Sequence, residues 1–200
     1  MSTPLQQFDM FVDAPVVPGF AYSGQFITPD DEGALIARIG EVALTPFRFQ
    51  GWLGKRLTAT FGWRYDFDDA SFGPAEPMPD WLLPLRDRAA AFAGLDPAEL
   101  TQASINRYDT GAGIGWHRDR PVFEQVVGVS LGAPAVLRFR QRIPGDFRRA
   151  TVPLAPRSAY RMTGEVRHDW EHSVPDQDGT RWSIMFRNLS DKGRRRLANP

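Results

Sequence analysis

Two stretches in the second half of the chain have the patterns of buried β-strands. Residues 126–131 form a short, almost continuously apolar run, which is typical of a strand covered on both faces. Residues 136–142 alternate instead, so that Leu137 and Phe139 share one face and three arginines share the other. Pro-Gly at 144–145 then indicates a turn, and residues 182–187 have the composition of a further strand.

The first half of the chain contains two helical patterns. Three acids at 30–32 precede apolar residues of helical spacing at 34–39, as is common in the first turn of a helix. A second helix is expected from Asp80, as its N-cap, to Gly94, with Pro84 in the first turn, where a missing N–H is tolerated. Helices followed by several strands predict an α+β domain built on a β-sandwich or barrel.

Composition narrows the class of protein. At 200 residues the chain fits one domain, and it contains no cysteine, which excludes disulfides, thiolate zinc sites and iron–sulfur clusters. No run of eighteen apolar residues and no basic n-region with an apolar segment is present. We therefore expect a cytoplasmic protein with no signal peptide and no membrane span.

The formal net charge of zero hides an asymmetry along the chain. Residues 1–100 contain 7 Lys or Arg against 14 Asp or Glu, whereas residues 101–200 contain 17 against 10. Lys55 and Lys192 are the only lysines, so nearly all the positive charge is arginine, whose planar fork suits carboxylates and phosphates. The arginines could serve to bind such anions or could be ordinary solvated surface charge, and the sequence pattern leaves both interpretations open.

A His-x-Asp pair follows a glycine-rich stretch at 111–115. On extended backbone, residues i and i+2 point to the same side, so His117 and Asp119 can reach one ion. With one distant histidine they would form the 2-His-1-carboxylate triad, which leaves positions of an Fe(II) ion open. Only His168 and His172 remain as third ligand, and, if both lie in one strand, alternation does not choose between them.

The last predicted strand carries a second polar pattern. By alternation, Arg181, Ser183, Met185 and Arg187 share one face. Two arginines that look into a sheet interior are costly unless an anion meets them, and a dicarboxylate cosubstrate would supply such anions. Arg181 could form a fork with a carboxylate, with Ser183 adding a hydroxyl. The alternative is that these four residues form an exposed face of an edge strand. The His-x-Asp pair favours the cosubstrate interpretation over this alternative.

Five separated motifs, in this order along the chain, resemble the AlkB-like family of Fe(II)/2-oxoglutarate dioxygenases. The resemblance covers roughly residues 45–190. Its motifs are Asn106-Arg-Tyr108, Gly111-x-Gly-Ile-Gly-x-His117-x-Asp119, Val129-Ser-Leu-Gly132, Gly164 with Trp170-Glu-His172, and Arg181-x-Ser-x-x-Phe-Arg187.

The resemblance implies a double-stranded β-helix, or jelly roll, with N-terminal helices packed outside. It also implies Fe(II), 2-oxoglutarate and O2, and it selects His172 over His168, because the family's distal histidine follows a Trp-x pair. The implied iron ligands are His117, Asp119 and His172. The implied 2-oxoglutarate contacts are Asn106, Tyr108, Arg181, Ser183 and Arg187, with Arg181 on the distal carboxylate and Arg187 near the C1 carboxylate.

The substrate implied by the family is an N-alkylated base in single-stranded or damaged DNA or RNA. Trp63 and Tyr65 lie where related enzymes carry a lid, and their rings could stack on an extruded base or simply pack the sheet. Five arginines could contact phosphates or form a solvated strand face, namely Arg138, Arg140, Arg142, Arg148 and Arg149.

One departure from the family concerns base recognition. Repair members place an acid two positions after the iron-binding aspartate, where this chain has Pro121. A hydroxylase or demethylase of a protein side chain or small molecule is therefore the alternative. A binding module without activity and a zinc hydrolase fit less well, because neither needs Arg181 and Arg187 on one face.

The expected organisation has three parts. An N-terminal arm covers residues 1–18, the dioxygenase domain covers 19–190, and a basic tail covers 191–200. The Arg194-Arg-Arg196 tail is expected to be a disordered, solvated end. The protein is expected to be a monomer.

Overall fold

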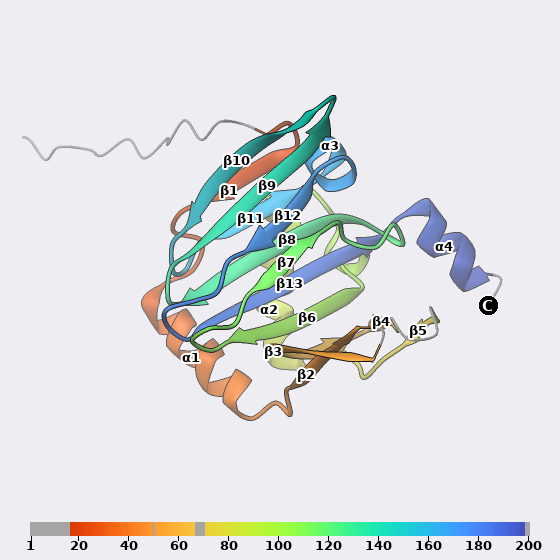
Figure 1. The fold of residues 1–200 in the computed structure, drawn as a ribbon. Coiled ribbons are helices and arrows are strands. Elements are labelled where there is room, and N and C mark those ends of the chain that lie inside the picture. The colour runs from red at the N-terminus through yellow and green to blue at the C-terminus, as the bar shows by residue number, and fades with distance from the viewer. Residues whose placement is uncertain (1–16, 50, 67–70, 199–200) are drawn as a thin grey trace, which may run out of the picture.

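Two antiparallel sheets lie face to face and enclose the interior of the protein (Figure 1). The computed structural model describes residues 17–49, 51–66 and 71–198. The larger sheet has seven strands, in the order β1 (Phe20–Ser23), β11 (Ala159–Met162), β8 (Phe123–Gly132), β13 (Arg181–Leu189), β6 (Gln102–Tyr108), β3 (Trp52–Phe61) and β2 (Thr45–Phe49). The smaller sheet has four, in the order β10 (Asp146–Leu154), β9 (Ala135–Ile143), β12 (Glu171–Val174) and β7 (Ile114–His117). A separate pair consists of β4 (Trp63–Tyr65) and β5 (Phe72–Pro74).

The strands from β6 to β13 pass back and forth between the two sheets. β6, β8, β11 and β13 belong to the larger sheet, and β7, β9, β10 and β12 to the smaller one. Within the larger sheet, β13 pairs with β6 on one side and with β8 on the other. The first and last strands of this core, β6 and β13, are therefore neighbours. This is the predicted jelly roll, and the α+β fold class is confirmed.

Alternation along β8 and β13 decides which side chains enter the space between the sheets. One set of side chains packs in a cluster with the helices: Val127, Val129, Leu131, Ile184 and Phe186. The opposite face of β13 carries Arg181, Ser183, Met185 and Arg187, and Met185 packs with Leu137 and Phe139 of the smaller sheet. The predicted shared face of these four residues is therefore the interior face.

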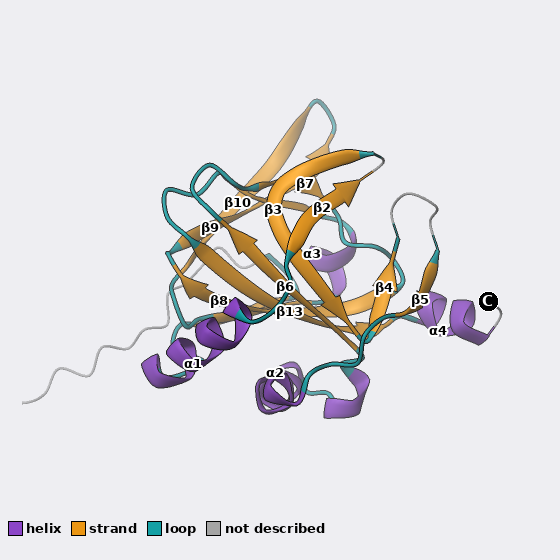
Figure 2. Cartoon of the chain, turned by 90° about the horizontal axis from the view of Figure 1, so that it is seen from below, coloured by secondary structure: helices purple, strands orange, loops and turns teal. Residues whose placement is uncertain are grey.

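Helices α1 (Pro29–Gly40) and α2 (Leu83–Ala93) lie against the face of the larger sheet that points away from the smaller one (Figure 2). α1 begins after Thr28, whose hydroxyl accepts a hydrogen bond from the Asp31 backbone N–H, while the Asp31 carboxylate accepts one from the Thr28 N–H. This reciprocal cap stabilises the first turn, which carries the expected acids.

The prediction of Asp80 as an N-cap is wrong. Asp80–Leu82 form a 3-10 turn, η1, and the α-helix starts only at Leu83. In an α-helix, the carbonyl of Asp80 would accept from the N–H of residue 84, but Pro84 has none. That carbonyl instead accepts from the Leu83 N–H, three residues on. The predicted end is correct, because Gly94 follows the helix with φ +70°.

The C-terminal segment also differs from expectation. Asp191–Ala198 form helix α4, not a disordered end. Ser190 caps it, since its hydroxyl accepts from the Gly193 N–H at 3.1 Å, and Leu197 packs against a small cluster of Val122, Phe123 and Leu189. Residues 1–16 of the predicted arm lie outside the described residues.

The remaining elements are the 3-10 turn η2 (Pro97–Glu99) and the short helix α3 (Gly164–His168). None of the helices in the described part of the chain is long and apolar enough to span a membrane.

Candidate active site

Two histidines lie side by side on neighbouring strands of the smaller sheet. His117 ends β7 and is paired directly with His172 of β12, and their ring centroids are 4.3 Å apart. Asp119 lies two residues after His117, in the loop that leaves the strand. One ligand atom from each of the three lies within 4.8 Å of the others. This spacing approaches the span of two metal–ligand bonds of about 2 Å each, so the group fits a single ion after small side-chain shifts.

The protonation of these imidazoles suits metal binding. The Nδ1 atom of His117 lies 2.8 Å from the carbonyl oxygen of Gly115, which assigns the proton to Nδ1 and leaves the Nε2 lone pair free. Burial lowers the pKa of His117 below its usual value. Burial, with the charge of His117 adding to it, lowers the pKa of His172 to about 3. Both rings are therefore neutral near pH 7, as ligands must be.

Asp119 is held as a carboxylate. Burial raises its pKa, but the positive charges of Arg187 and Arg167 outweigh burial and hold the pKa well below the usual range. The Nε of Arg187 donates to Asp119 Oδ2 over 3.3 Å. A negative ligand beside two neutral imidazoles is the donor set of non-haem Fe(II) oxygenases.

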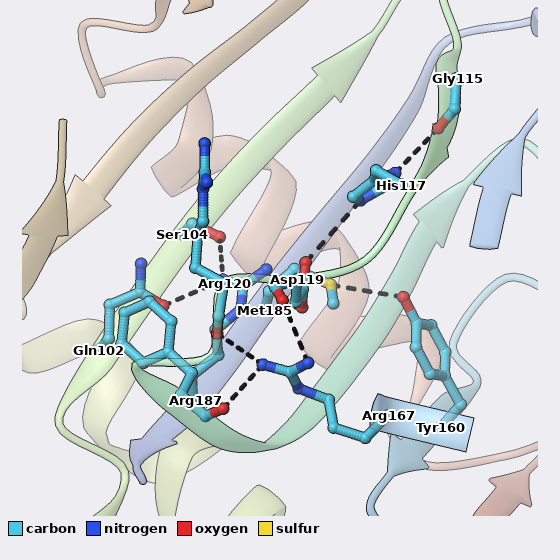
Figure 3. Close-up of polar contacts among 11 residues, drawn as sticks. Gln102, Ser104, Gly115, His117, Asp119, Arg120, Tyr160, Arg167, Met185 and Arg187 are labelled. Carbon is cyan, nitrogen blue, oxygen red and sulfur yellow. Dashed lines mark hydrogen bonds and ion pairs between the residues drawn. The ribbon is translucent and has the colours of Figure 1, made fainter. Parts of the chain in front are cut away.

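Two arginines hold this carboxylate and its loop (Figure 3). Arg187 also donates to Gln102 Oε1 at 3.0 Å and to Ser104 Oγ at 3.1 Å, which fixes its guanidinium. Arg167, on α3, is only 3% exposed and donates to the carbonyl oxygens of Asp119, Arg120 and Phe123 at 3.2, 2.7 and 2.7 Å. Sequence reasoning missed Arg167, because a five-residue helix shows no periodic pattern.

The choice between the two remaining histidines follows from α3. His168 is the last residue of this helix, so the assumption that it shares a strand with His172 is wrong. Its Nε2 lies 2.9 Å from Glu124 Oε1, and its side chain is 41% exposed. Among the described residues, the group that could hold a metal ion contains His172 and not His168.

A polar row crosses the interior from Arg181 toward Asp119. On neighbouring strands, Arg181 pairs with Tyr108, and Ser183 pairs with Asn106. Each of these four side chains is buried, and Arg181 is 1% exposed. At the other end, Arg187 pairs with Gln102. The strand register therefore brings all five predicted 2-oxoglutarate residues to the interior face of β6 and β13.

Arg181 is a buried cation without a carboxylate partner. Its Nε donates to Ser130 Oγ over 3.2 Å, and its guanidinium lies 5.2 Å from the centroid of the Tyr108 ring. Within the described ranges, no salt bridge includes Arg181. A buried charge is costly unless an anion meets it, so this end of the row fits a carboxylate.

The two predicted substrate residues lie on β4. The Trp63 ring is 5.7 Å from that of Phe72, and Tyr65 packs against the cluster of Val122, Phe123 and Leu189. The guanidinium of Arg120, the residue after Asp119, lies 4.7 Å from the Tyr65 ring centroid. β4 therefore borders the Asp119 loop, but both rings already have packing partners.

The glycine-rich stretch at 111–115 allows a close approach of two strands at the site. A Cβ on Gly113 would lie 2.8 Å from the backbone of Val174 and Pro175. Only glycine lets β7 approach the end of β12 this closely, and that approach sets His117 opposite His172.

Comparison with known proteins gives a consistent result. A family model described as the 2OG-Fe(II) oxygenase superfamily matches residues 47–197. Uncharacterized protein L905 of Acanthamoeba polyphaga mimivirus is 26% identical over 192 residues, covering 86% of this chain and 85% of the viral protein.

Two relatives carry AlkB names. The alkylated DNA repair protein ALKBH8 homolog of Arabidopsis thaliana is 23% identical over 185 residues, which cover 80% of this chain and 51% of that protein. The alpha-ketoglutarate-dependent dioxygenase AlkB of Escherichia coli is 33% identical over 102 residues, or 49% of this chain and 45% of AlkB. The alignments thus span about half of either relative. The solved structure of OsALKBH1 superposes with a TM-score of 0.69 at 18% identity, covering 86% of this chain and 98% of that one.

Proposed function

Since the chain belongs to the 2OG-Fe(II) oxygenase superfamily and is AlkB-like, we propose that it oxidatively removes alkyl groups from nitrogen atoms of nucleic acid bases. It is a dioxygenase that uses Fe(II), 2-oxoglutarate and O2. The observation that carries the proposal is the combination of the His117, Asp119 and His172 group with the buried cation of Arg181, which has no salt bridge to any described carboxylate.

The residues divide into two sets of roles. His117, Asp119 and His172 would hold the iron, which supplies O2 activation coupled to decarboxylation of 2-oxoglutarate to succinate and CO2. Arg181 would form the charge-assisted contact to the distal carboxylate of 2-oxoglutarate, with Asn106, Tyr108 and Ser183 beside it. Arg187, which fixes Asp119, would lie near the C1 carboxylate.

The overall reaction balances on the substrate. One oxygen atom of O2 enters succinate, and the other is inserted into a C–H bond of the N-alkyl group. When the alkyl group is methyl, the resulting N-hydroxymethyl group loses formaldehyde. The N–C bond breaks and leaves its electron pair on the ring nitrogen, and the hydroxyl proton is released to water when the methylated base is a cation, as N1-methyladenine and N3-methylcytosine are. The protein's part is to orient the methyl group and exclude water from the interior between the sheets.

A nucleic acid substrate is supported by the names of two relatives and by the arginine-rich second half of the chain. Pro121 favours the alternative, a protein side chain or a small molecule as substrate. It supplies no carboxylate at the position where repair enzymes carry one, and its backbone carbonyl accepts from the Ser190 hydroxyl at 2.6 Å.

The test is succinate release from purified protein with Fe(II), ascorbate and 2-oxoglutarate. Single strands with N1-methyladenine and N3-methylcytosine are compared with the unmethylated strand of the same sequence. His172→Ala and His168→Ala form a matched pair, because one removes a candidate ligand and the other an exposed histidine nearby.

We expect succinate to rise with the methylated strand, to persist in His168→Ala and to vanish in His172→Ala. Succinate that depends on His172 but is indifferent to methylation would move the substrate to a protein or small molecule. No succinate in the wild-type protein under any condition would refute the roles assigned to the triad.

A further inference from the structure

The outer face of the smaller sheet carries an unusual concentration of arginine. Residues 138–149 contain five arginines and one acid, Asp146, in a chain whose formal net charge is zero. This face lies on the opposite side of the sheet from His117 and His172. We call it the arginine–aromatic face and define it by Trp116, Arg138, Arg140, Arg142, Phe147 and Arg149.

Strand alternation and register put these residues on one surface. On β9, Leu137 and Phe139 are buried between the sheets, so the three arginines that alternate with them point outward. On β10, Phe147 pairs with Arg142, and Arg149 pairs with Arg140. Trp116 precedes the inward His117 on β7, and its ring meets Arg138 and Arg140.

The arginines lie close to the aromatic rings, within the range of cation–π contacts. Arg140 lies between two rings, 4.5 Å from the centroid of Trp116 and 4.7 Å from that of Phe147. Arg138 lies 5.2 Å from Trp116, while Arg142 and Arg149 lie 5.2 and 5.5 Å from Phe147. A guanidinium held beside an aromatic ring loses side-chain freedom, and it has five N–H donors, more than the one or two that Arg138, Arg140 and Arg149 use within the protein.

Carboxylates neutralise only part of this charge. Glu171 contacts Arg140 at 2.6 Å, and Asp146 contacts Arg149 at 3.1 Å. In the described part of the chain, Arg138 and Arg142 have no salt bridge. Arg140 and Arg149 are a direct cross-strand pair of like charges, which Glu171 and Asp146 offset, so the charge that remains for a ligand is that of Arg138 and Arg142.

We propose that the arginine–aromatic face binds the sugar–phosphate backbone of single-stranded nucleic acid. This deepens the proposed function and rests on it. Immobilised arginine forks match phosphate oxygens, and interleaved rings offer stacking surfaces to unpaired bases. A merely solvated strand face would have no need of Trp116 and Phe147 on its solvent side.

The place of the face relative to the candidate active site fits this role. β7 is an edge strand of the smaller sheet (Figure 1), and its neighbouring residues Trp116 and His117 point to opposite sides of it. A strand that binds along the outer face and bends over this edge therefore comes from the arginines directly to the side on which the triad lies.

The experiment measures binding of a labelled, unmethylated thymidylate strand to the full-length chain over a range of salt concentrations. Neither iron nor 2-oxoglutarate is added, so the result does not depend on turnover. Arg142→Ala/Arg149→Ala removes two exposed members of the face. Arg38→Ala/Arg86→Ala removes the same charge from helices α1 and α2, and Arg142→Lys/Arg149→Lys keeps the charge.

Each phosphate contact to a single strand contributes ~0.7 to the slope of log affinity against log salt, so the alanine pair should lower the slope by about 1.4. At moderate salt, the same loss corresponds to an affinity roughly tenfold lower. The helix pair should change neither quantity, and the lysine pair should keep the slope.

Three outcomes would overturn the proposal. The first is wild-type affinity for the strand in the Arg142/Arg149 alanine pair, and the second is an equal loss of affinity in the helix pair. The third is binding of polyglutamate that is as tight as that of the strand and as sensitive to the alanine pair, which would make the face a surface for acidic proteins. The proposed function fails separately: a wild-type protein that binds the strand through this face but releases no methyl-dependent succinate refutes demethylation and leaves the face intact.

Discussion

Arg167 donates a hydrogen bond to the backbone carbonyl oxygen of Asp119 over 3.2 Å, from the short helix that precedes β12. The contact is with the backbone and not with the carboxylate, whose Oδ2 accepts from Arg187 instead. Together with the contacts to Arg120 and Phe123, it shapes the loop on which Asp119 depends for its position.

Replacing Arg167 should therefore weaken metal binding as well as the fold. Arg167→Met leaves three carbonyl oxygens without their donor, at a cost of about 3 kcal/mol or more in the free energy of unfolding. We expect Mn(II) affinity to fall about 10–100-fold, as for loss of other outer-shell partners. Calorimetric titration with Mn(II) and urea unfolding measure the two effects.

Arg161→Met is the matched control. Arg161 also donates to a carbonyl, that of Ala93, and its Nε is also buried without a partner. It lies away from the triad, so it should lower stability and leave Mn(II) affinity unchanged. An equal loss of affinity in both variants would show that Arg167 acts only through stability.

His172→Ala should abolish tight metal binding. It removes the imidazole directly opposite His117, so its effect should exceed the roughly 10–100-fold that loss of an outer-shell partner costs. His168→Ala, at the Glu124 contact, should bind Co(II) like the wild-type protein. Co(II) absorption titrations report the result, and unchanged binding by His172→Ala would contradict the assigned ligand set.

Arg181→Met should separate stability from cosubstrate binding. Methionine replaces a buried cation that has no carboxylate partner by an apolar side chain of similar length. The free energy of unfolding of the unliganded protein should therefore stay the same or rise, by at most about 1–4 kcal/mol. Binding of 2-oxoglutarate should weaken by about 2–4 kcal/mol, or roughly 30- to 700-fold.

Thermal unfolding with and without 2-oxoglutarate measures both effects, because a ligand of the native state raises Tm. Wild-type protein should show the rise, and so should Arg107→Met, which removes an arginine of the neighbouring strand β6 and its exposed ion pair with Asp109. Arg181→Met should not. A rise that persists in Arg181→Met would exclude the proposed carboxylate contact.

Gly128→Ala should destabilise the jelly roll. A Cβ at this position of β8 would lie 2.4 Å from the Tyr160 ring, so strands or ring must shift, at a cost of about 1–3 kcal/mol. Gly33→Ala is the control, since nothing lies within 4 Å of its Cβ position in α1. It should stabilise by about 0.5–1 kcal/mol. Urea unfolding gives both values, and a neutral Gly128→Ala would mean that Tyr160 moves freely.

Several elements were predictable because their causes are local. The alternation at 136–142 and 182–187 appears as β9 and β13, and Gly94 ends α2 as expected. The Asp80 prediction failed for a local reason as well: capping chemistry favoured Asp80, but Pro84 withheld the N–H that an α-helical bond to Asp80 needs. The basic tail became a helix because Ser190 and packing of Leu197 offset the repulsion among its arginines.

The sequence by itself determined the strand faces and the His117 and Asp119 ligands, and, through its resemblance to a family, the jelly roll and the choice of His172 over His168. Side-chain alternation and motif order are written along the chain, so they need no knowledge of distant contacts. Only the tertiary structure decided that β7 and β12 are neighbouring strands and which of their residues pair. Their pairing sets His172 opposite His117, puts His168 outside, and brings Arg167 to the Asp119 loop. Such contacts depend on the register between strands far apart in the chain, and the chain's local pattern does not encode that register.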